Sequence, residues 1–222
     1  SYGYDEIRFP IVEKTELYTR SNEAADIVTK EMYTFEDKGG ESISLRPEGT
    51  AGCVRAAIEN DLLRTDKPRL WYSGPMFRYE RPQKGRSRQF HQFSAEVFGL
   101  NSPEIDAELI LMSARLWKKL GILEDLRLEI NNLGNEKTRN LYSESLVNFL
   151  KEKNEGLDDD TRRKMVENPL RILDSKSSVI QDILKKAPKI EDFIDESSKN
   201  YQINLLELLK KAGIKYTVNP QL

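Results

Sequence analysis

Apolar and polar residues alternate through much of the first half of the chain, a pattern typical of β-strands that bury one face. Residues 32–37 and 41–46 alternate on either side of Lys38-Gly39-Gly40, which predicts a hairpin. Residues 6–12 and the alternating apolar positions of residues 126–130 predict two further strands. This part of the chain is therefore expected to be rich in sheet.

A second antiparallel pair is predicted from residues 69–81 and 88–98. The segment between these runs is basic and contains the breakers Pro82 and Gly85, so we expect a long charged loop from 81 to 88.

Two stretches in the same half have the periodicity of helices. Thr50 can cap a helix over residues 50–63, with its apolar stripe at Val54, Ala57, Ile58 and Leu62. We expect Cys53 to pack beside this stripe, because a single cysteine more often fills a core than reacts. A longer helix begins at Ser102-Pro103 and ends at Gly121.

Residues 135–212 change in character to helical segments rich in Lys and Glu, with breaks at Asn168-Pro169 and Ala187-Pro188. The sequence therefore predicts a main domain at 1–134, a helical insertion at 135–212 and a strand at 213–222 that returns to the main domain. The fold class is α+β, an antiparallel sheet flanked by helices.

Composition excludes several classes of protein. The chain has 35 Lys and Arg against 37 Asp and Glu, so its overall charge does not predict nucleic-acid binding. The one cysteine and the one histidine are too few for a disulfide scaffold or a zinc site. No run is long and apolar enough to span a membrane, and residues 1–10 lack the layout of a signal peptide, which favours the cytosol.

One face of the second strand pair has an unusual composition. Side chains alternate across a strand, so Arg78 and Glu80 share one face, and Phe90, Gln92, Ser94 and Glu96 share a face of the partner. A purely solvated face would not include Phe90, and a core face would exclude the charges. The opposite faces carry Phe77 and Tyr79, then Phe93, Ala95 and Val97, which we expect to pack on helices.

The mixed face suits a nucleoside triphosphate. An arginine can hold a phosphate, a carboxylate can accept from an exocyclic amine, and an aromatic ring can stack on a base. The alternative is an exposed strand with incidental ion pairs, and periodicity does not decide between the two.

Three segments resemble class II aminoacyl-tRNA synthetases, and the histidyl enzymes among them. Residues 74–93, with Phe77-Arg78-Tyr79-Glu80-Arg81, look like motif 2. Gly3-Tyr4 with Pro10 resembles the strand of motif 1, and Arg46-Pro47-Glu48-Gly49-Thr50 resembles the histidyl substrate segment. Residues 168–176 resemble part of that family's helical insertion.

The resemblance implies a catalytic core that activates histidine with ATP and Mg²⁺ as substrates, without protein-bound zinc or any other protein metal site, and then charges tRNA(His). Arg78 would bind the α-phosphate as the catalytic residue. Glu80 and Phe90 would hold adenine, and Arg86 would reach the γ-phosphate. Histidine would be held by Glu48, Thr50, Gln92 and Glu96, with Glu96 at the imidazole. A cytoplasmic homodimer is implied for the full-length protein. The basic residues Arg162-Arg163-Lys164 and Lys185-Lys186 could contact tRNA or form solvated helix faces.

The chain also departs from the family pattern. It lacks the family's histidine-specific loop, motif 3 and anticodon-binding domain, so we expect an excerpt of a longer protein, inactive or nearly so by itself. Residues 21–24 differ from the usual family run, which contains a glycine. One alternative is the histidyl-synthetase-like regulatory subunit of ATP phosphoribosyltransferase, which generally lacks the helical insertion. The other is a synthetase for a different amino acid, which would share Arg78 and Phe90 but not the segment from Arg46 to Thr50 together with Gln92 and Glu96.

Overall fold

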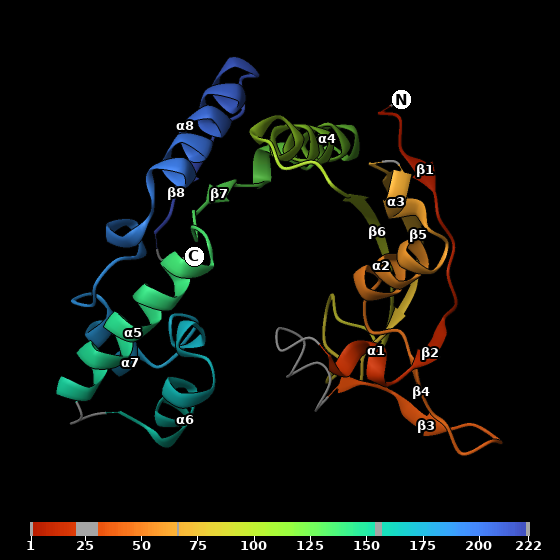
Figure 1. The fold of residues 1–222 in the computed structure, drawn as a ribbon, viewed down its shortest axis with the longest axis horizontal. Helices are drawn as coiled ribbons and strands as arrows, with labels where there is room; N and C mark the ends of the chain where they lie inside the picture. The colour runs from red at the N-terminus through yellow and green to blue at the C-terminus, as the bar shows by residue number, and fades with distance from the viewer. Residues whose placement is uncertain (1, 21–30, 66, 154–156, 221–222) are drawn as a thin grey trace. The chain divides into compact units, whose positions relative to one another are not determined.

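The computed structural model of the chain describes residues 2–20, 31–65, 67–153 and 157–220 (Figure 1). Residues 21–24, where the sequence departs from the family pattern, lie outside these ranges. The chain forms two compact units that divide after Asn101, inside the predicted main domain. The predicted boundaries at 134 and 212 stay a prediction. None of the helices in the described ranges has the length and apolarity that a membrane span needs.

The first unit contains two small sheets with short helices. Its strands are β1 (Asp5–Glu6), β2 (Val12–Lys14), β3 (Thr34–Glu36), β4 (Ser42–Leu45), β5 (Arg69–Phe77) and β6 (Gln89–Val97). Its helices are α1 (Glu16–Thr19), α2 (Thr50–Glu59) and α3 (Leu62–Thr65). One sheet has the order β1-β5-β6 and the other β2-β4-β3. All pairs in the two sheets are antiparallel except β1 with β5.

The second unit is mainly helical. Its helices are α4 (Pro103–Leu120), α5 (Glu136–Glu152), α6 (Asp159–Glu167), α7 (Ser178–Leu184) and α8 (Glu196–Lys211). Short 3₁₀ helices lie at Leu123–Asp125, Pro169–Ile172 and Ile190–Phe193. The strands β7 (Glu129–Ile130) and β8 (Thr217–Val218) pair in parallel. The α+β fold class is therefore confirmed, with strands concentrated before Asn101 and helices after it.

Both predicted hairpins are confirmed, and the turn of the first is held by one side chain. Asp37 Oδ1 accepts from the backbone N–H groups of Gly39 at 2.7 Å and Glu41 at 2.9 Å. Gly40 has a φ of +80°, which glycine adopts without strain. The turn residues thus fix the register of β3 on β4.

Three predicted elements are shorter or divided. The strand expected at residues 6–12 is two strands in different sheets, because Pro10 lacks the N–H group that a continuous ladder needs. The helix expected at 50–63 ends at Glu59, because Asp61 adopts a left-handed φ of 55°. The chain becomes helical again in α3. The strand expected from Leu126 begins only at Glu129.

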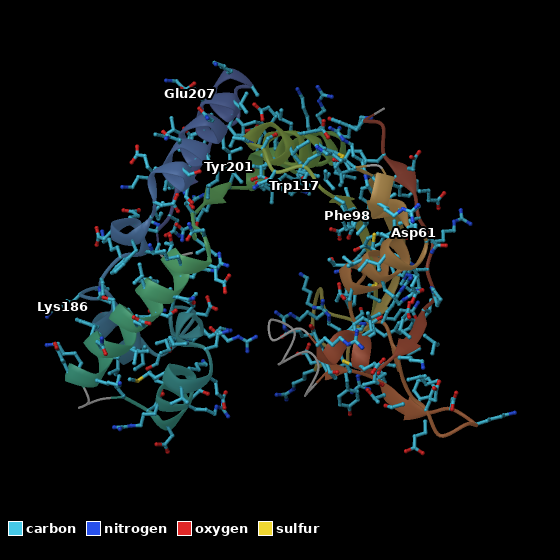
Figure 2. The ribbon with its side chains drawn as sticks, in the orientation of Figure 1. Asp61, Phe98, Trp117, Lys186, Tyr201 and Glu207 are labelled. Carbon is cyan, nitrogen blue, oxygen red and sulfur yellow. The ribbon has the colours of Figure 1, made fainter. Side chains whose placement is uncertain are left out.

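The second unit contains two separate apolar cores. The one between α4 and α8 includes Ala107, Leu205 and Leu209, and Tyr201 of α8 donates to Asp106 of α4 at 3.0 Å (Figure 2). The other lies among α5, α6 and α7 and is formed by Tyr142, Leu146, Leu150, Leu157, Ile172, Ile180 and Ile190. The predicted insertion thus has a core of its own, and its helices α5, α6 and α8 begin at the side-chain caps of Asn135, Asp158 and Asp195.

Candidate functional site

The β5–β6 pairing places most of the predicted site on one surface. Opposite residues of an antiparallel pair lie on the same face. Phe90 is opposite Met76, Gln92 is opposite Gly74, and Glu96 is opposite Leu70. Phe90, Gln92, Ser94 and Glu96 therefore share a face, as the sequence predicted.

The prediction of which face packs on helices was wrong. Leu70, Tyr72 and Met76 form a core with Cys53 and Ala57 of α2, so the helix covers the mixed face. On the opposite face Phe93 is 58% exposed, and its ring stacks on Trp71 at 5.6 Å. Tyr79, just after β5, is 54% exposed. The core and the site thus occupy different parts of one surface.

Residues 46–50 run alongside β5 and begin at a buried arginine. Arg46 O accepts from the Phe77 backbone at 3.0 Å. The Arg46 side chain donates from Nε to Pro75 O at 2.9 Å and from Nη1 to Phe9 O at 3.1 Å. A Cβ at Gly74 would lie 2.3 Å from Arg46 Nη2, so this approach requires glycine. Burial lowers the pKa of Arg46, and the two carbonyl groups compensate in part for its lost hydration.

Glu48, rather than Thr50, supplies the acceptor at the start of α2. The Glu48 carboxylate accepts from the backbone N–H of Thr50 and, at 3.0 Å, from that of Ala51. The N-cap residue is Gly49, and the predicted capping role of Thr50 is therefore wrong. The Thr50 side chain instead points to β6. Its Oγ1 donates to Glu96 Oε1 at 2.9 Å, which joins two predicted histidine ligands from distant parts of the sequence.

The structure adds Tyr72 to this end of the site. Its hydroxyl donates to Glu96 Oε1 at 3.3 Å, and the hydroxyl groups of Ser94 and Thr50 also interact with it. Burial, followed by the nearby charges of Glu96 and Glu48, raises the pKa of Tyr72, so its hydroxyl keeps its proton. The sequence signal for Tyr72 was its position in the alternation of residues 69–81, six residues before Arg78 on the same face.

Arg78 and Phe90 meet at the other end. The Arg78 guanidinium carbon lies 5.2 Å from the Phe90 ring centroid, and Nε donates to Pro47 O at 2.8 Å. Within the described ranges, neither terminal nitrogen of Arg78 has a partner in the protein. The arrangement presents two N–H edges of a fixed, planar cation, which suits an anionic oxygen.

Glu80 and Arg86 lie in the loop after β5. Arg86 Nη1 is 3.7 Å from Glu80 Oε2, and an isolated bridge joins Gln83 to Arg86. This is a long contact with an exposed arginine, so it contributes little to stability. Gln92 lies between the two ends of the site, and among the described residues its amide has no hydrogen-bond partner. All eight predicted site residues thus belong to the first unit.

The site has opposite charges at its two ends. Arg78 lies beside Phe90, and Arg86 lies near Glu80 in the loop after β5, whereas Glu48 and Glu96 lie beside the start of α2. Phe90 and Glu96 are separated by six residues of β6, which corresponds to roughly 20 Å at about 3.3 Å per residue. Such a surface fits an elongated ligand or ligand pair with phosphates at one end and cationic or N–H groups at the other.

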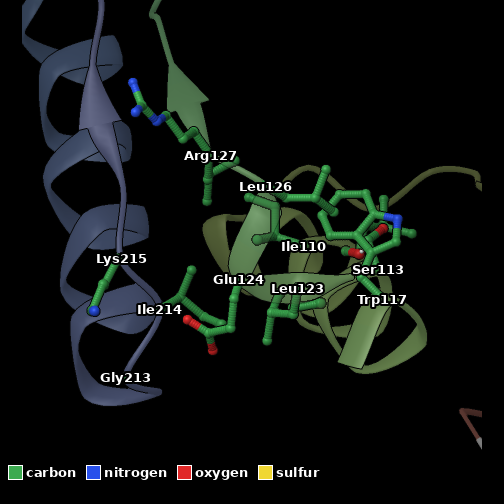
Figure 3. Close-up of a pocket in the computed structure, with 13 residues that line it drawn as sticks. Ile110, Ser113, Trp117, Leu123, Glu124, Leu126, Arg127, Gly213, Ile214 and Lys215 are labelled. Atoms are coloured by element: carbon green, nitrogen blue, oxygen red, sulfur yellow. Dashed lines mark hydrogen bonds between the residues drawn. The ribbon is translucent and has the colours of Figure 1, made fainter. Parts of the chain in front are cut away.

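A separate cavity of about 440 Å³ lies in the second unit, between α4, residues 123–128 and residues 213–215 (Figure 3). Its wall is mostly apolar, and Figure 3 shows the charged ends of Arg127 and Lys215 directed away from Trp117. The cavity contains none of the predicted site residues.

Comparisons with known proteins agree with the fold. The family model of histidyl-tRNA synthetase matches residues 1–135. The structure of apo histidyl-tRNA synthetase from S. aureus is 38% identical with a TM-score of 0.77, over 99% of this chain and 49% of that one. The chain therefore spans about half the length of that protein.

Two more distant structures share the fold. An ATP phosphoribosyltransferase regulatory subunit/histidyl-tRNA synthetase from Bacillus halodurans C is 21% identical with a TM-score of 0.58, over 98% of this chain and 59% of that one. A histidine–tRNA ligase subunit from Alicyclobacillus acidocaldarius is 18% identical with a TM-score of 0.54, over 99% of this chain and 71% of that one.

Proposed function

Because the chain belongs to the histidyl-tRNA synthetase family, we propose that the full-length protein activates histidine with ATP and transfers the histidyl group to tRNA(His). The observation that carries this proposal is the opposite charge of the two ends of the site. At one end Arg78 lies over an aromatic ring, with Arg86 in the following loop, and carboxylates and hydroxyls gather at the other end. ATP and histidine need these two environments side by side.

The Arg78 end would bind ATP. Adenine would stack on Phe90 with its exocyclic amine donating to Glu80, and Arg78 would hold the α-phosphate through its terminal nitrogens. Arg86 would move from Glu80 to the γ-phosphate, which is a stronger partner than a carboxylate 3.7 Å away. Mg²⁺ would enter with ATP as part of the substrate and would neutralise part of the charge of the leaving pyrophosphate.

The Glu96 end would bind histidine. The ammonium group of an amino acid can only donate, so it needs acceptors. Glu48 has lone pairs beyond those that α2 uses, and Thr50 Oγ1 and the Gln92 carbonyl oxygen can also accept. The imidazole N–H would donate to Glu96. An amino acid whose side chain cannot form this bond would leave Glu96 without a partner, so the site would discriminate strongly against it.

The reaction would then proceed in two steps. A histidine carboxylate oxygen attacks the α-phosphorus, the bond to the bridging oxygen breaks, and pyrophosphate leaves. A hydroxyl of the terminal adenosine of tRNA next attacks the histidyl carbonyl carbon, and AMP leaves. Arg78 would stabilise the charge that develops on the α-phosphate in the first step, and the remaining side chains would align the reactants.

Contacts with tRNA, the homodimer and a cytoplasmic location belong to the same proposal. In the insertion, the candidate tRNA residues Arg163 and Lys164 pair with Asp160 at 2.6 and 2.7 Å, and Lys185 pairs with Asp182 at 2.7 Å. These pairs lie within single helices or at their ends, and all their side chains except Lys164 are exposed. A phosphate could displace them at little cost, but they equally fit a solvated surface.

The deciding experiment is ATP–pyrophosphate exchange by the full-length protein that carries this chain, run with each standard amino acid in turn. Exchange with histidine alone is the expected result. Histidine binding without exchange would contradict the enzyme and favour a regulatory subunit of ATP phosphoribosyltransferase. Exchange with another amino acid would contradict the specificity. The intact Arg78, Glu80, Arg86 and Phe90 set supports the enzyme, because a regulator has no need of a triphosphate site.

A further inference from the structure

We propose that Tyr72 is a positioning residue that sets histidine specificity by fixing the carboxylate of Glu96. The inference rests on the proposed function, since it assumes that Glu96 receives the imidazole. It adds a residue that does not itself contact the substrate and acts through its hydrogen bond to Glu96. Three observations carry it: the confinement of the Tyr72 ring, the convergence of two hydroxyls on one oxygen, and the order of donors in that network.

The Tyr72 ring is held on two sides. Phe9 meets it edge to face, with centroids 5.0 Å apart and an interplanar angle of 73°. A Cβ at Gly49 would lie 2.2 Å from Tyr72 Cε2 and 2.7 Å from its hydroxyl oxygen, so the backbone of the α2 N-cap is in direct contact with the ring. Tyr72 is buried, and a ring packed in this way has a single rotamer available. Its hydroxyl is therefore a fixed donor.

Two hydroxyls bind the same oxygen of Glu96. Thr50 Oγ1 and the Tyr72 hydroxyl both donate to Oε1, at 2.9 and 3.3 Å. Among the described residues, the other oxygen, Oε2, accepts no hydrogen bond. A carboxylate with one donor can turn about that bond, whereas two donors from different elements fix its plane. Oε2 is thus presented in one direction, available to a ring N–H.

The donors have a consistent order. Each hydroxyl has one proton to give. Thr50 gives its proton to Glu96, and Tyr72 does the same, so the Tyr72 oxygen is left to accept. Ser94, opposite Tyr72 across β5 and β6, interacts with that oxygen and can fill the role of donor. The two hydroxyl donors to Glu96 therefore belong to one network, and such networks rigidify the groups they end on.

The test is Tyr72→Phe in the full-length protein, which removes one oxygen and keeps the ring. The KM for histidine in ATP–pyrophosphate exchange should rise about 10-fold, the value of one hydrogen bond to a charged group. The KM for ATP should stay unchanged, because Phe90 and Arg78 lie at the other end. Tyr142→Phe, at a buried tyrosine of the insertion core, is the matched control and should leave both KM values unchanged.

A double-mutant cycle separates positioning from general damage. In a Glu96→Gln background, Tyr72→Phe should change the histidine KM less than about 2-fold, because its effect passes through Glu96. An unchanged histidine KM in the single variant would overturn the role of Tyr72, as would equal rises in both KM values. If the unmutated protein shows no histidine-dependent exchange, the proposed function itself fails. The unmutated protein is therefore measured before any variant.

Discussion

The guanidinium of Arg78 lies over the Phe90 ring, with 5.2 Å between its central carbon and the ring centroid. Its Nε is engaged by Pro47 O at 2.8 Å, so the orientation of the cation is fixed from β6 and from the 46–50 segment together. A charge held in this way before the substrate binds needs no reorganisation during the reaction.

Arg78→Ala in the full-length protein should therefore lower the rate of adenylate formation at least ~100-fold, by loss of a preorganised charge. Arg78→Lys should recover only part of this rate, because an ammonium cannot use the planar fork of the guanidinium. Single-turnover formation of histidyl-adenylate measures both. Arg64→Ala, at an exposed arginine of α3, is the control and should react at the unmutated rate. Unchanged kinetics in Arg78→Ala would refute this site assignment.

Arg46→Met should destabilise the first unit by about 3 kcal/mol, because Phe9 O and Pro75 O would be left buried without donors. Trp71 and Trp117 are the two tryptophans of the chain and lie in different units. In a Trp117→Phe background, urea unfolding followed by fluorescence thus reports on the first unit. Arg8→Met, at an exposed arginine that pairs with Glu6, should leave the midpoint unchanged. An equal effect of the two variants would contradict the buried role.

Gly49→Ala should also destabilise the first unit, by about 2 kcal/mol, because the added carbon would overlap the confined Tyr72 ring. The same urea measurement applies. The comparison is Gly39→Ala, where the added carbon meets only the Asp37 carboxylate at 3.3 Å in an exposed turn. A smaller loss for Gly49 than for Gly39 would mean that the ring can move aside, and would weaken the argument for a fixed Tyr72.

The stability of the first unit should fall in alkali. Burial, followed by the charges of Glu96 and Glu48, raises the pKa of Cys53 from 9.0 to about 11. The unfolded thiol ionises first, so the stabilisation is complete below pH 9 and is lost as the pH rises toward 11. The urea midpoint should decline across this window, and less steeply in Cys53→Ala. Native Cys53 should also resist thiol reagents at pH 8, and rapid labelling there would contradict its burial.

The local sequence patterns predicted the strands and helices, and which site residues lie together, better than they predicted how the site packs against the rest of the unit. The alternation of residues 69–81 and 88–98 predicted both long strands and the shared face of Phe90, Gln92 and Glu96, because a strand has a fixed period of two. The same argument could not determine which face α2 would cover. That depends on Gly49 and Gly74, which give Tyr72 and Arg46 room on the mixed face.

Contacts between distant residues were the other features that the pattern could not supply. Thr50 was expected to cap its helix, since threonine does so often, but its hydroxyl is used by Glu96, 46 residues away. Glu48 caps the start of α2 instead, through the same carboxylate that was predicted to bind the histidine amino group. Competition of this kind between local and long-range partners appears only once the chain is folded.

The shared surface of core and site limits how this protein can be altered. Leu70, Tyr72 and Met76 pack against α2 on the same face of β5 that leads to Glu96 and Phe90. If these groups align the reactants as proposed, a substitution that changes the packing there will shift them, so gains in heat resistance at these positions will cost catalytic rate.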